Sequence, residues 1–158
     1  MSTPELNVAV GDRFPTEILD GLHNQVQAAD GMTAIYLYPA DNTPTCTRQA
    51  VEFQRASEAL SAARVQVIGV STDDEESHQG FAEDNDLSLG LVADPERRLV
   101  QELGALRDYG EYGELSDRVT FLVDGEGIIR RIWHVDDVVA HPAEVLAAAA
   151  ELTDQQAK

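Results

Sequence analysis

The strongest candidate for chemistry in this sequence is Cys46, the only cysteine among 158 residues. It lies in the stretch YPADNTPTCT, residues 38–47, which contains two prolines and three threonines. If Thr43 is the N-cap of a helix, Pro44 takes the first helical position, where its missing N–H costs nothing. Cys46 then lies in the first turn, near unpaired backbone N–H groups and the positive end of the helix dipole. Both features favour the thiolate over the thiol, so this stretch predicts a reactive cysteine.

The competing interpretation of Cys46 is structural, because many lone cysteines are small buried apolar residues. The expected placement, between a strand and a helix, favours a reactive thiol without identifying a reaction. A chain with one cysteine cannot form an internal disulfide.

The apolar patterns on either side of Cys46 predict an α/β fold. We expect strands at 33–38, 64–72, 89–93, 118–124 and 128–135, and helices at 45–62, after 72, from 94 to 103 and from 142 onward. Residues 20–25 are interpreted as a turn between two short strands, and residues 107–117 as a loop. Alternation of strands and helices implies parallel crossovers, and the DGEG turn at 124–127 implies a final hairpin. The result is a central mixed β-sheet flanked by helices, with Cys46 at the carboxyl end of a strand, where active residues gather.

Two helix starts carry capping signals. A capping box of Thr72 with Glu75, or of Asp73 with Glu76, is expected to open the helix after the second long strand. Asp94 is expected to cap the next helix, with Pro95 in its first turn.

The composition excludes several classes of protein. The length suits one domain spanning residues 1–158. Acidic residues outnumber basic ones by 29 to 11, and the net charge of -18 disfavours nucleic acid and anionic membranes as partners. No apolar run could span a bilayer, and the N-terminus lacks the pattern of a signal peptide. We therefore expect a cytoplasmic protein, where thiols stay reduced. The four histidines lack ligand-like spacing, so no metal site is expected.

Several motifs resemble one known family. Pro39, Thr43 and Cys46 match the spacing P-x-x-x-T-x-x-C, which resembles the active-site signature of the peroxiredoxins. The wider stretch YPADNTPTCTRQAVEF is most similar to the bacterioferritin-comigratory-protein, or Q-type, branch. The segments 70–87, 89–105 and 117–133 are also similar to that branch. The likeness extends from about Val10 to Leu152 and covers nearly the whole chain.

The resemblance implies a thioredoxin-like fold and thiol-dependent reduction of hydrogen peroxide and organic hydroperoxides. It implies that Cys46 attacks the peroxide as a thiolate, that Thr43 hydrogen-bonds the peroxide and that Pro39 shields the sulfur from water. Arg118 heads the R-x-T-F-L-x-D strand, and the resemblance implies that it stabilises the thiolate and orients the peroxide. A guanidinium, a hydroxyl and backbone N–H groups can stabilise the negative charge that builds on the leaving oxygen. No metal, flavin or haem cofactor is implied, because sulfur itself takes the oxidation.

The sequence departs from the family pattern at two positions. Many Q-type members carry a resolving cysteine five residues after the first, where this chain has Val51. The sulfenic acid at Cys46 would then need an external thiol: a low-molecular-weight thiol, a thioredoxin or glutaredoxin-type protein, or Cys46 of another copy. Gln49 replaces a glutamate that is common in the family and pairs there with arginine. A neutral glutamine would leave more positive charge on a nearby arginine, which predicts a larger thiolate fraction. Both a monomer and a homodimer remain open.

Two alternatives to a peroxidase are compatible with this fold. One is a catalytically silent binding or holdase protein on the same fold, which the intact set of Pro39, Thr43, Cys46 and Arg118 argues against. The other is a thiol–disulfide oxidoreductase, which usually needs a C-x-x-C pair, whereas residue 49 is glutamine. Outside this set, His78 is interpreted as a surface residue rather than a general base.

Overall fold

A five-stranded mixed sheet forms the centre of the computed structural model, which describes residues 5–29 and 31–156. The strands are β1 (Met32–Leu37), β2 (Val65–Ser71), β3 (Gly90–Ala93), β6 (Val119–Val123) and β7 (Ile129–His134), in the spatial order β3–β2–β1–β6–β7. β1, β2 and β3 run parallel, whereas β6 is antiparallel to β1 and β7 is antiparallel to β6. The predicted central mixed sheet is therefore confirmed.

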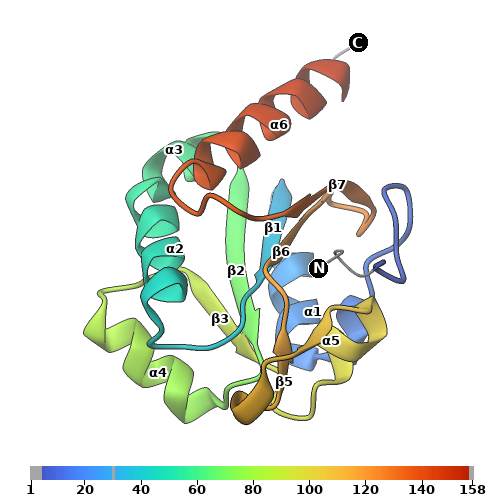
Figure 1. Cartoon of the computed structure of the whole chain (residues 1–158). Helices are drawn as coiled ribbons and strands as arrows, with labels where there is room; N and C mark the ends of the chain where they lie inside the picture. Colours follow the sequence, from blue (N-terminus) through green and yellow to red (C-terminus); the bar gives the residue numbers. More distant parts are fainter. Residues whose placement is uncertain (1–4, 30, 157–158) are drawn as a thin grey trace.

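Helices cover both faces of this sheet (Figure 1). One face carries α1 (Asp20–Ala28) and α5 (Arg98–Leu103), and the other carries α2 (Pro44–Arg55), α3 (Ser57–Ala62) and α6 (His141–Gln156). α4 (Glu75–Asp84) follows β2, and short 3-10 helices occupy Thr16–Ile18 and Gly110–Tyr112. Among the helices of the described residues, none has the length and apolar character needed to cross a membrane.

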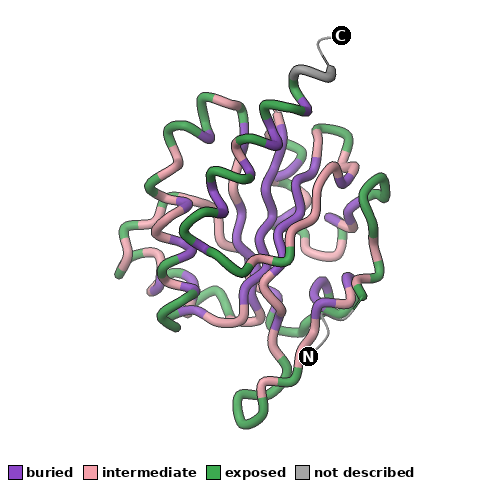
Figure 2. Tube along the Cα trace, turned by 45° about the horizontal axis from the view of Figure 1, so that its top comes forward, coloured by how far each residue is buried: buried purple, intermediate pink, exposed green. Residues whose placement is uncertain are grey.

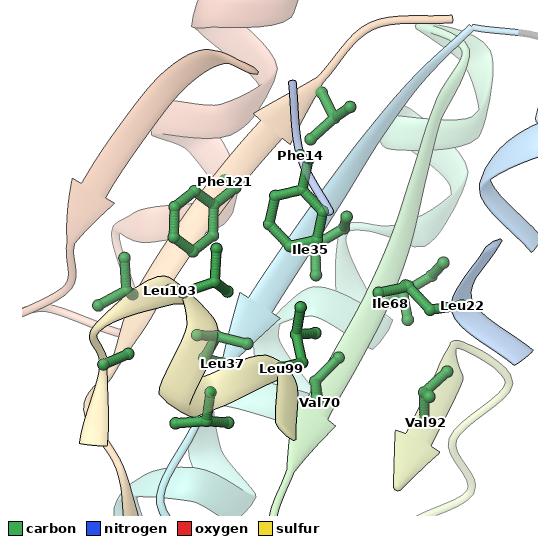
Figure 3. Packing of buried hydrophobic residues seen from close by; sticks show 14 of the residues in the cluster. Phe14, Leu22, Ile35, Leu37, Ile68, Val70, Val92, Leu99, Leu103 and Phe121 are labelled. Atoms are coloured by element: carbon green, nitrogen blue, oxygen red, sulfur yellow. The ribbon is translucent and has the colours of Figure 1, made fainter. Parts of the chain in front are cut away.

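The strand β1 separates two hydrophobic clusters. Its Ile35 and Leu37 side chains point to the α1 and α5 face, where they pack with residues such as Leu99 and Phe121 (Figure 3). The alternate residues Ala34 and Tyr36 belong to the cluster on the opposite face, because successive side chains of a strand point to opposite sides. All six residues of β1 are buried, and the central strands form the buried interior (Figure 2). This arrangement places the carboxyl end of β1 beneath the start of α2.

Two of the expected irregular segments are regular structure. Residues 20–25 are part of α1, so the predicted turn between short strands is wrong. Gly21 suggested a turn, but Leu22 and Val26, four residues apart, both lie on the buried face of a helix. The expected loop at 107–117 contains the antiparallel strands β4 (Leu106–Asp108) and β5 (Glu114–Ser116), which form a small hairpin. Their three-residue length explains why no strand pattern is visible in the sequence.

Helix boundaries also differ from the predictions at three places. The helix expected at 45–62 is divided at Ala56, between α2 and α3. The cap of α4 is Asp74, whose carboxylate accepts a hydrogen bond from the Ser77 backbone N–H at 2.9 Å, rather than Thr72 or Asp73. α5 begins at Arg98 instead of Pro95, although the buried Asp94 carboxylate still accepts hydrogen bonds from backbone N–H groups of this helix.

The first residue of α6, His141, connects that helix to the sheet. Its Nε2 lies 2.9 Å from Thr120 Oγ1 on β6, and its Nδ1 lies 3.1 Å from Glu144 Oε1. The imidazole is fully buried and meets the rings of Phe53 and Trp133 edge-on. Burial lowers the pKa of His141 below its ordinary value of 6.5, and this effect outweighs the opposing influence of Glu144.

The free energy of unfolding is therefore expected to fall as the pH drops below about 6.5. In that range the unfolded chain takes up a proton at His141 before the folded chain does. The stabilisation is present above 6.5 and is lost as the pH falls through the lower pKa of the folded state. Urea unfolding between pH 7.5 and about 5 measures this slope. In His141→Gln the slope over this window should be smaller, and an unchanged slope would contradict the assignment to this histidine.

Candidate active site

The start of α2 has the backbone geometry that the sequence predicts. Thr43 is the N-cap with an extended conformation, Pro44 is the first helical residue, and the Thr47 backbone N–H donates to the Thr43 carbonyl at 2.9 Å. The Thr43 side chain does not cap the helix. Its hydroxyl instead donates to the carbonyl oxygen of Ala40 at 3.0 Å, within the segment that leads from β1 to α2.

Cys46 lies in the first turn of α2 with its thiol free and only 1% exposed. Its neighbours in the same hydrophobic cluster include the stacked rings of Tyr36, Tyr38 and Phe53. An apolar setting opposes a charged sulfur, whereas the helix N-terminus favours one. The balance therefore depends on a positive charge close to the sulfur.

Arg118 supplies that charge. It directly precedes β6, whose first residue, Val119, pairs with Leu37 at the carboxyl end of β1. This antiparallel register brings two residues 72 positions apart together, and Arg118 Nη2 lies 3.4 Å from Cys46 Sγ. A guanidinium at this distance favours the thiolate form of the sulfur by direct attraction.

Gln49 fixes the other side of the Arg118 guanidinium. It lies one turn after Cys46 on α2, is fully buried, and its Oε1 accepts a hydrogen bond from Arg118 Nη1 at 2.6 Å. Among the residues that the structure describes, no carboxylate forms an ion pair with Arg118. The nearby Asp117 carboxylate accepts from the Arg118 backbone N–H and pairs with Arg107. The positive charge that faces the sulfur is thus not neutralised by a partner.

Residues 39–43 connect β1 to α2 and contain the other predicted site residues. Pro39 is half-buried at the start of this segment and Thr43 is exposed at its end. Asn42 adopts a left-handed conformation with φ 66°, which is uncommon for a residue with a Cβ atom. The conformation of this short segment decides where Pro39 and Thr43 lie relative to the sulfur.

Comparison with known proteins identifies the family of this chain. Residues 10–132 match the AhpC/TSA family, a range that includes Pro39, Thr43, Cys46 and Arg118. The chain is 31% identical over 148 residues to the putative peroxiredoxin Bcp of Coxiella burnetii, covering 89% of this chain and 98% of the relative.

The chain belongs to the AhpC/TSA family.

Within this family, similar proteins include peroxiredoxins named Bcp and peroxiredoxin Q. Peroxiredoxin Bcp of Bacillus subtilis is 29% identical over 157 residues, which cover 95% of this chain and all of the relative. The bacterioferritin comigratory protein of Xanthomonas campestris, described for its alkyl peroxide reduction, has a similar structure with a TM-score of 0.71. The two share 29% identity over 78% of this chain and 79% of the other. A PrxQ mutant from Xylella fastidiosa shares the fold with a TM-score of 0.81 at 23% identity, over 93% of this chain and 98% of the other. The predicted thioredoxin-like peroxiredoxin fold is confirmed.

A buried polar cluster next to the site of this peroxiredoxin was not anticipated from the sequence. Asp41 and His78, 37 residues apart, meet through a 2.7 Å contact between Oδ2 and Nδ1. His78 is buried, so its interpretation as a surface residue is wrong. Burial alone would raise the pKa of Asp41, but hydrogen bonds from His78, Tyr38 and Ser77 outweigh it and hold this pKa below its usual range.

The same cluster is the place where a metal ion could be considered. Asp41, Asp73 and His78 hold potential ligand atoms within 4.8 Å of one another. Each of these side chains is hydrogen-bonded within the protein: Asp73 accepts from Ser71 and from the backbone of Asp41, and Asp41 accepts from His78. The contacts describe a hydrogen-bonded cluster that needs no ion to satisfy its polar atoms.

Two buried polar atoms in this part of the chain lack such partners. The Tyr36 hydroxyl and the Gln49 side-chain nitrogen form no hydrogen bond in the described structure. Burial, with a smaller contribution from a negative charge at Cys46, raises the pKa of Tyr36 well above its usual range. Tyr36 therefore stays a neutral hydrogen-bond donor.

Three cavities of the described structure have no lining residue in the reacting set. One of about 570 Å³ opens beside α3 and the edge of β2, where Phe53, Leu60 and Val67 line it, and none of the three described cavities is lined by Cys46.

Proposed function

We propose that this protein is a one-cysteine peroxidase, which reduces hydrogen peroxide and organic hydroperoxides at Cys46 and is regenerated by an external thiol. The observation that carries this proposal is the 3.4 Å contact between Arg118 Nη2 and Cys46 Sγ at the N-terminus of α2. Helix dipole, unpaired N–H groups and guanidinium act together on one buried sulfur.

The oxidation step balances without any further redox group. The Cys46 thiolate attacks one oxygen of the hydroperoxide, an S–O bond forms, and the O–O bond breaks. Sulfur loses two electrons and becomes sulfenic acid, while the other oxygen leaves as hydroxide or alkoxide and takes up one proton from solvent, equal to the proton that the thiol released on ionising, to give water or an alcohol. Arg118 is positioned to stabilise both the attacking thiolate and the oxygen on which negative charge develops.

Thr43 is suited to accept a hydrogen bond from the substrate. Its only hydroxyl hydrogen is used in the contact with the Ala40 carbonyl, so the lone pairs of its exposed oxygen remain for the O–H of a hydroperoxide. This contact would orient the substrate with its O–O bond toward the sulfur. In this assignment Thr43 holds substrate, and helix capping by its side chain is not required.

Thr43→Val removes the hydroxyl while keeping the shape of the side chain. We expect oxidation of Cys46 by peroxide to slow by about tenfold, the equivalent of one hydrogen bond worth about 1.4 kcal/mol. Thr43→Ser keeps the hydroxyl and should retain most of the rate. Rapid-quench measurements of sulfenic acid formation compare the three proteins, and equal rates for Val and wild type would remove Thr43 from the site.

Regeneration requires a thiol from outside the chain. Val51 lies on α2 with Cys46, five residues and a rise of about 7.5 Å along the helix, and no second cysteine exists. We expect a low-molecular-weight thiol, a thioredoxin or a glutaredoxin-type protein of the cytoplasm to attack the sulfenic acid, releasing water and forming a mixed disulfide. A second thiol then restores Cys46. Cys46, Thr43 and Arg118 come from one chain, so the proposed site is complete in a monomer or a homodimer.

The proposal is tested by intact-mass analysis of the reduced protein after a slight excess of hydrogen peroxide, with a sulfenic-acid trap present. Rapid, stoichiometric formation of one adduct at Cys46 supports the peroxidase. Reaction no faster than that of free cysteine would overturn it and would favour a binding or holdase protein on this fold. Turnover with single added thiols or thioredoxin then identifies the class of reductant.

A further inference from the structure

The segment that carries Pro39 and Thr43 is held at its middle residue, Asp41. The Asp41 carboxylate accepts three side-chain hydrogen bonds: from Tyr38 Oη at 2.6 Å, from Ser77 Oγ at 2.8 Å and from His78 Nδ1 at 2.7 Å. Its backbone N–H donates to Asp73 Oδ2 at 2.7 Å. Two of the three side-chain donors come from α4, so this helix fixes the connection between β1 and α2.

His78 is the most constrained of these donors. It is 4% exposed, its Nδ1 lies 2.7 Å from the Asp41 carboxylate, which can only accept a hydrogen bond, and its Nε2 lies 3.4 Å from Ser71 Oγ at the end of β2. The contacts from Ser71 to His78 and from His78 to Asp41 join the same residue types as the Ser-His-Asp triad of hydrolases. Ser71, however, is fully buried and donates its hydroxyl hydrogen to Asp73 Oδ2 at 2.8 Å, so no substrate can reach it in the folded structure. The cluster is suited to holding a segment and not to hydrolysis.

We propose that His78 is a positioning residue for the peroxide site: through Asp41 it holds residues 39–43 against α4 and thereby places Pro39 and Thr43 over Cys46. This inference rests on the proposed peroxidase function. Helix α4 contributes none of the residues Pro39, Thr43, Cys46 and Arg118. In this proposal it nevertheless controls how they are arranged.

The left-handed backbone at Asn42 supports this role. A residue other than glycine at φ 66° costs free energy, and such a conformation persists where its surroundings determine it. Asn42 lies between Asp41, which is fixed by four contacts, and Thr43, which is fixed as the N-cap of α2. Without the contact to His78, the segment can relax toward an ordinary conformation, which displaces the Thr43 hydroxyl and uncovers the sulfur.

Loss of the contact should therefore move two rate constants in opposite directions. In His78→Leu, oxidation of Cys46 by hydrogen peroxide should slow by about tenfold or more, because small misplacements of a reacting constellation are costly. Alkylation of the same thiol by iodoacetamide should become several-fold faster, because a sulfur that is 1% exposed becomes accessible. In His78→Asn, whose side-chain N–H can donate to Asp41 in place of Nδ1, both rates should return close to wild type.

Asp74→Ala is the matched control. It removes the side-chain cap of the same helix, α4, without touching the contact between Asp41 and His78. Both rates should stay near those of the wild type. If Asp74→Ala changes them as His78→Leu does, the effect is one of helix stability and the proposal is overturned.

Further outcomes separate this proposal from the proposed function. If the wild type does not react with peroxide, the peroxidase assignment fails, and iodoacetamide alkylation still decides the positioning role. Equal alkylation and oxidation rates in His78→Leu and wild type would overturn the role of His78 alone. If His78→Leu does not fold, Ser77→Ala takes its place, because it removes one of the three donors to Asp41. Its oxidation by peroxide should be slower and its alkylation by iodoacetamide faster than in the wild type, each by less than the changes expected for His78→Leu. Unchanged rates in that variant would overturn the proposal.

Discussion

Cys46→Ser is expected to form no sulfenic acid and to consume hydroperoxide no faster than buffer alone. The serine oxygen fits the position of the sulfur beside Arg118, but a hydroxyl is not ionised near neutral pH and cannot take the two-electron oxidation. The loss should be complete, because this chain contains no second thiol. Peroxide consumption with excess reductant, followed over time, measures it.

The control for this variant is its fold. Cys46 is buried among apolar rings, so a hydroxyl in its place should lower the free energy of unfolding by about 1–3 kcal/mol. The helical content recorded by circular dichroism should not change. Peroxide consumption that persists in folded Cys46→Ser would show that the reaction occurs at another group and would contradict the proposed mechanism.

Arg118→Leu should slow the oxidation of Cys46 by about 10²–10³-fold, the range found when one fixed donor to a developing anion is removed. In the proposed mechanism, the variant loses both the guanidinium that contacts Cys46 Sγ and the donor to the departing oxygen. The second-order rate constant for sulfenic acid formation, compared between the variant and the wild type in rapid-quench experiments, measures the loss.

Two milder variants define why the guanidinium matters. Arg118→Lys keeps the charge but cannot contact Gln49 Oε1 and Cys46 Sγ with a planar pair of nitrogens, so we expect an intermediate rate. Gln49→Glu places a carboxylate on the same guanidinium, which offsets part of the positive charge that faces Cys46 Sγ, and should lower the rate by less than Arg118→Leu does. If Arg118→Leu reacts as fast as the wild type, the role of this arginine is contradicted.

The sequence predicts those parts of the fold that depend on local patterns. The long apolar strands and the start of α2 are found because Thr43 and Pro44 have strong conformational preferences next to a β-branched run. α1 is missed because Gly21 and Asp20 have turn propensities, and burial of Leu22 and Val26 against the sheet overrides them.

The candidate site is predictable only in part for a related reason. Cys46 and its helix follow from neighbouring residues, whereas Arg118 was identified through a family resemblance and could not have been placed by spacing. The contact of Asp41 with His78 has no local signature, because each residue alone is typical of a loop or a helix surface. This pair forms because α4 packs near the carboxyl end of β1. Hydrophobic periodicity predicts the helix and the strand but not which residues meet between them.

The origin of Arg118 on a late strand has a consequence for the newly made chain. During synthesis Cys46 leaves the ribosome long before β6 and β7 exist, and the sulfur then has neither its guanidinium nor its buried setting. Until β6 docks against β1, the nascent protein carries an ordinary, slowly oxidised thiol. Under the proposed mechanism, Cys46 therefore gains its full reactivity toward peroxide only after β6 has docked against β1.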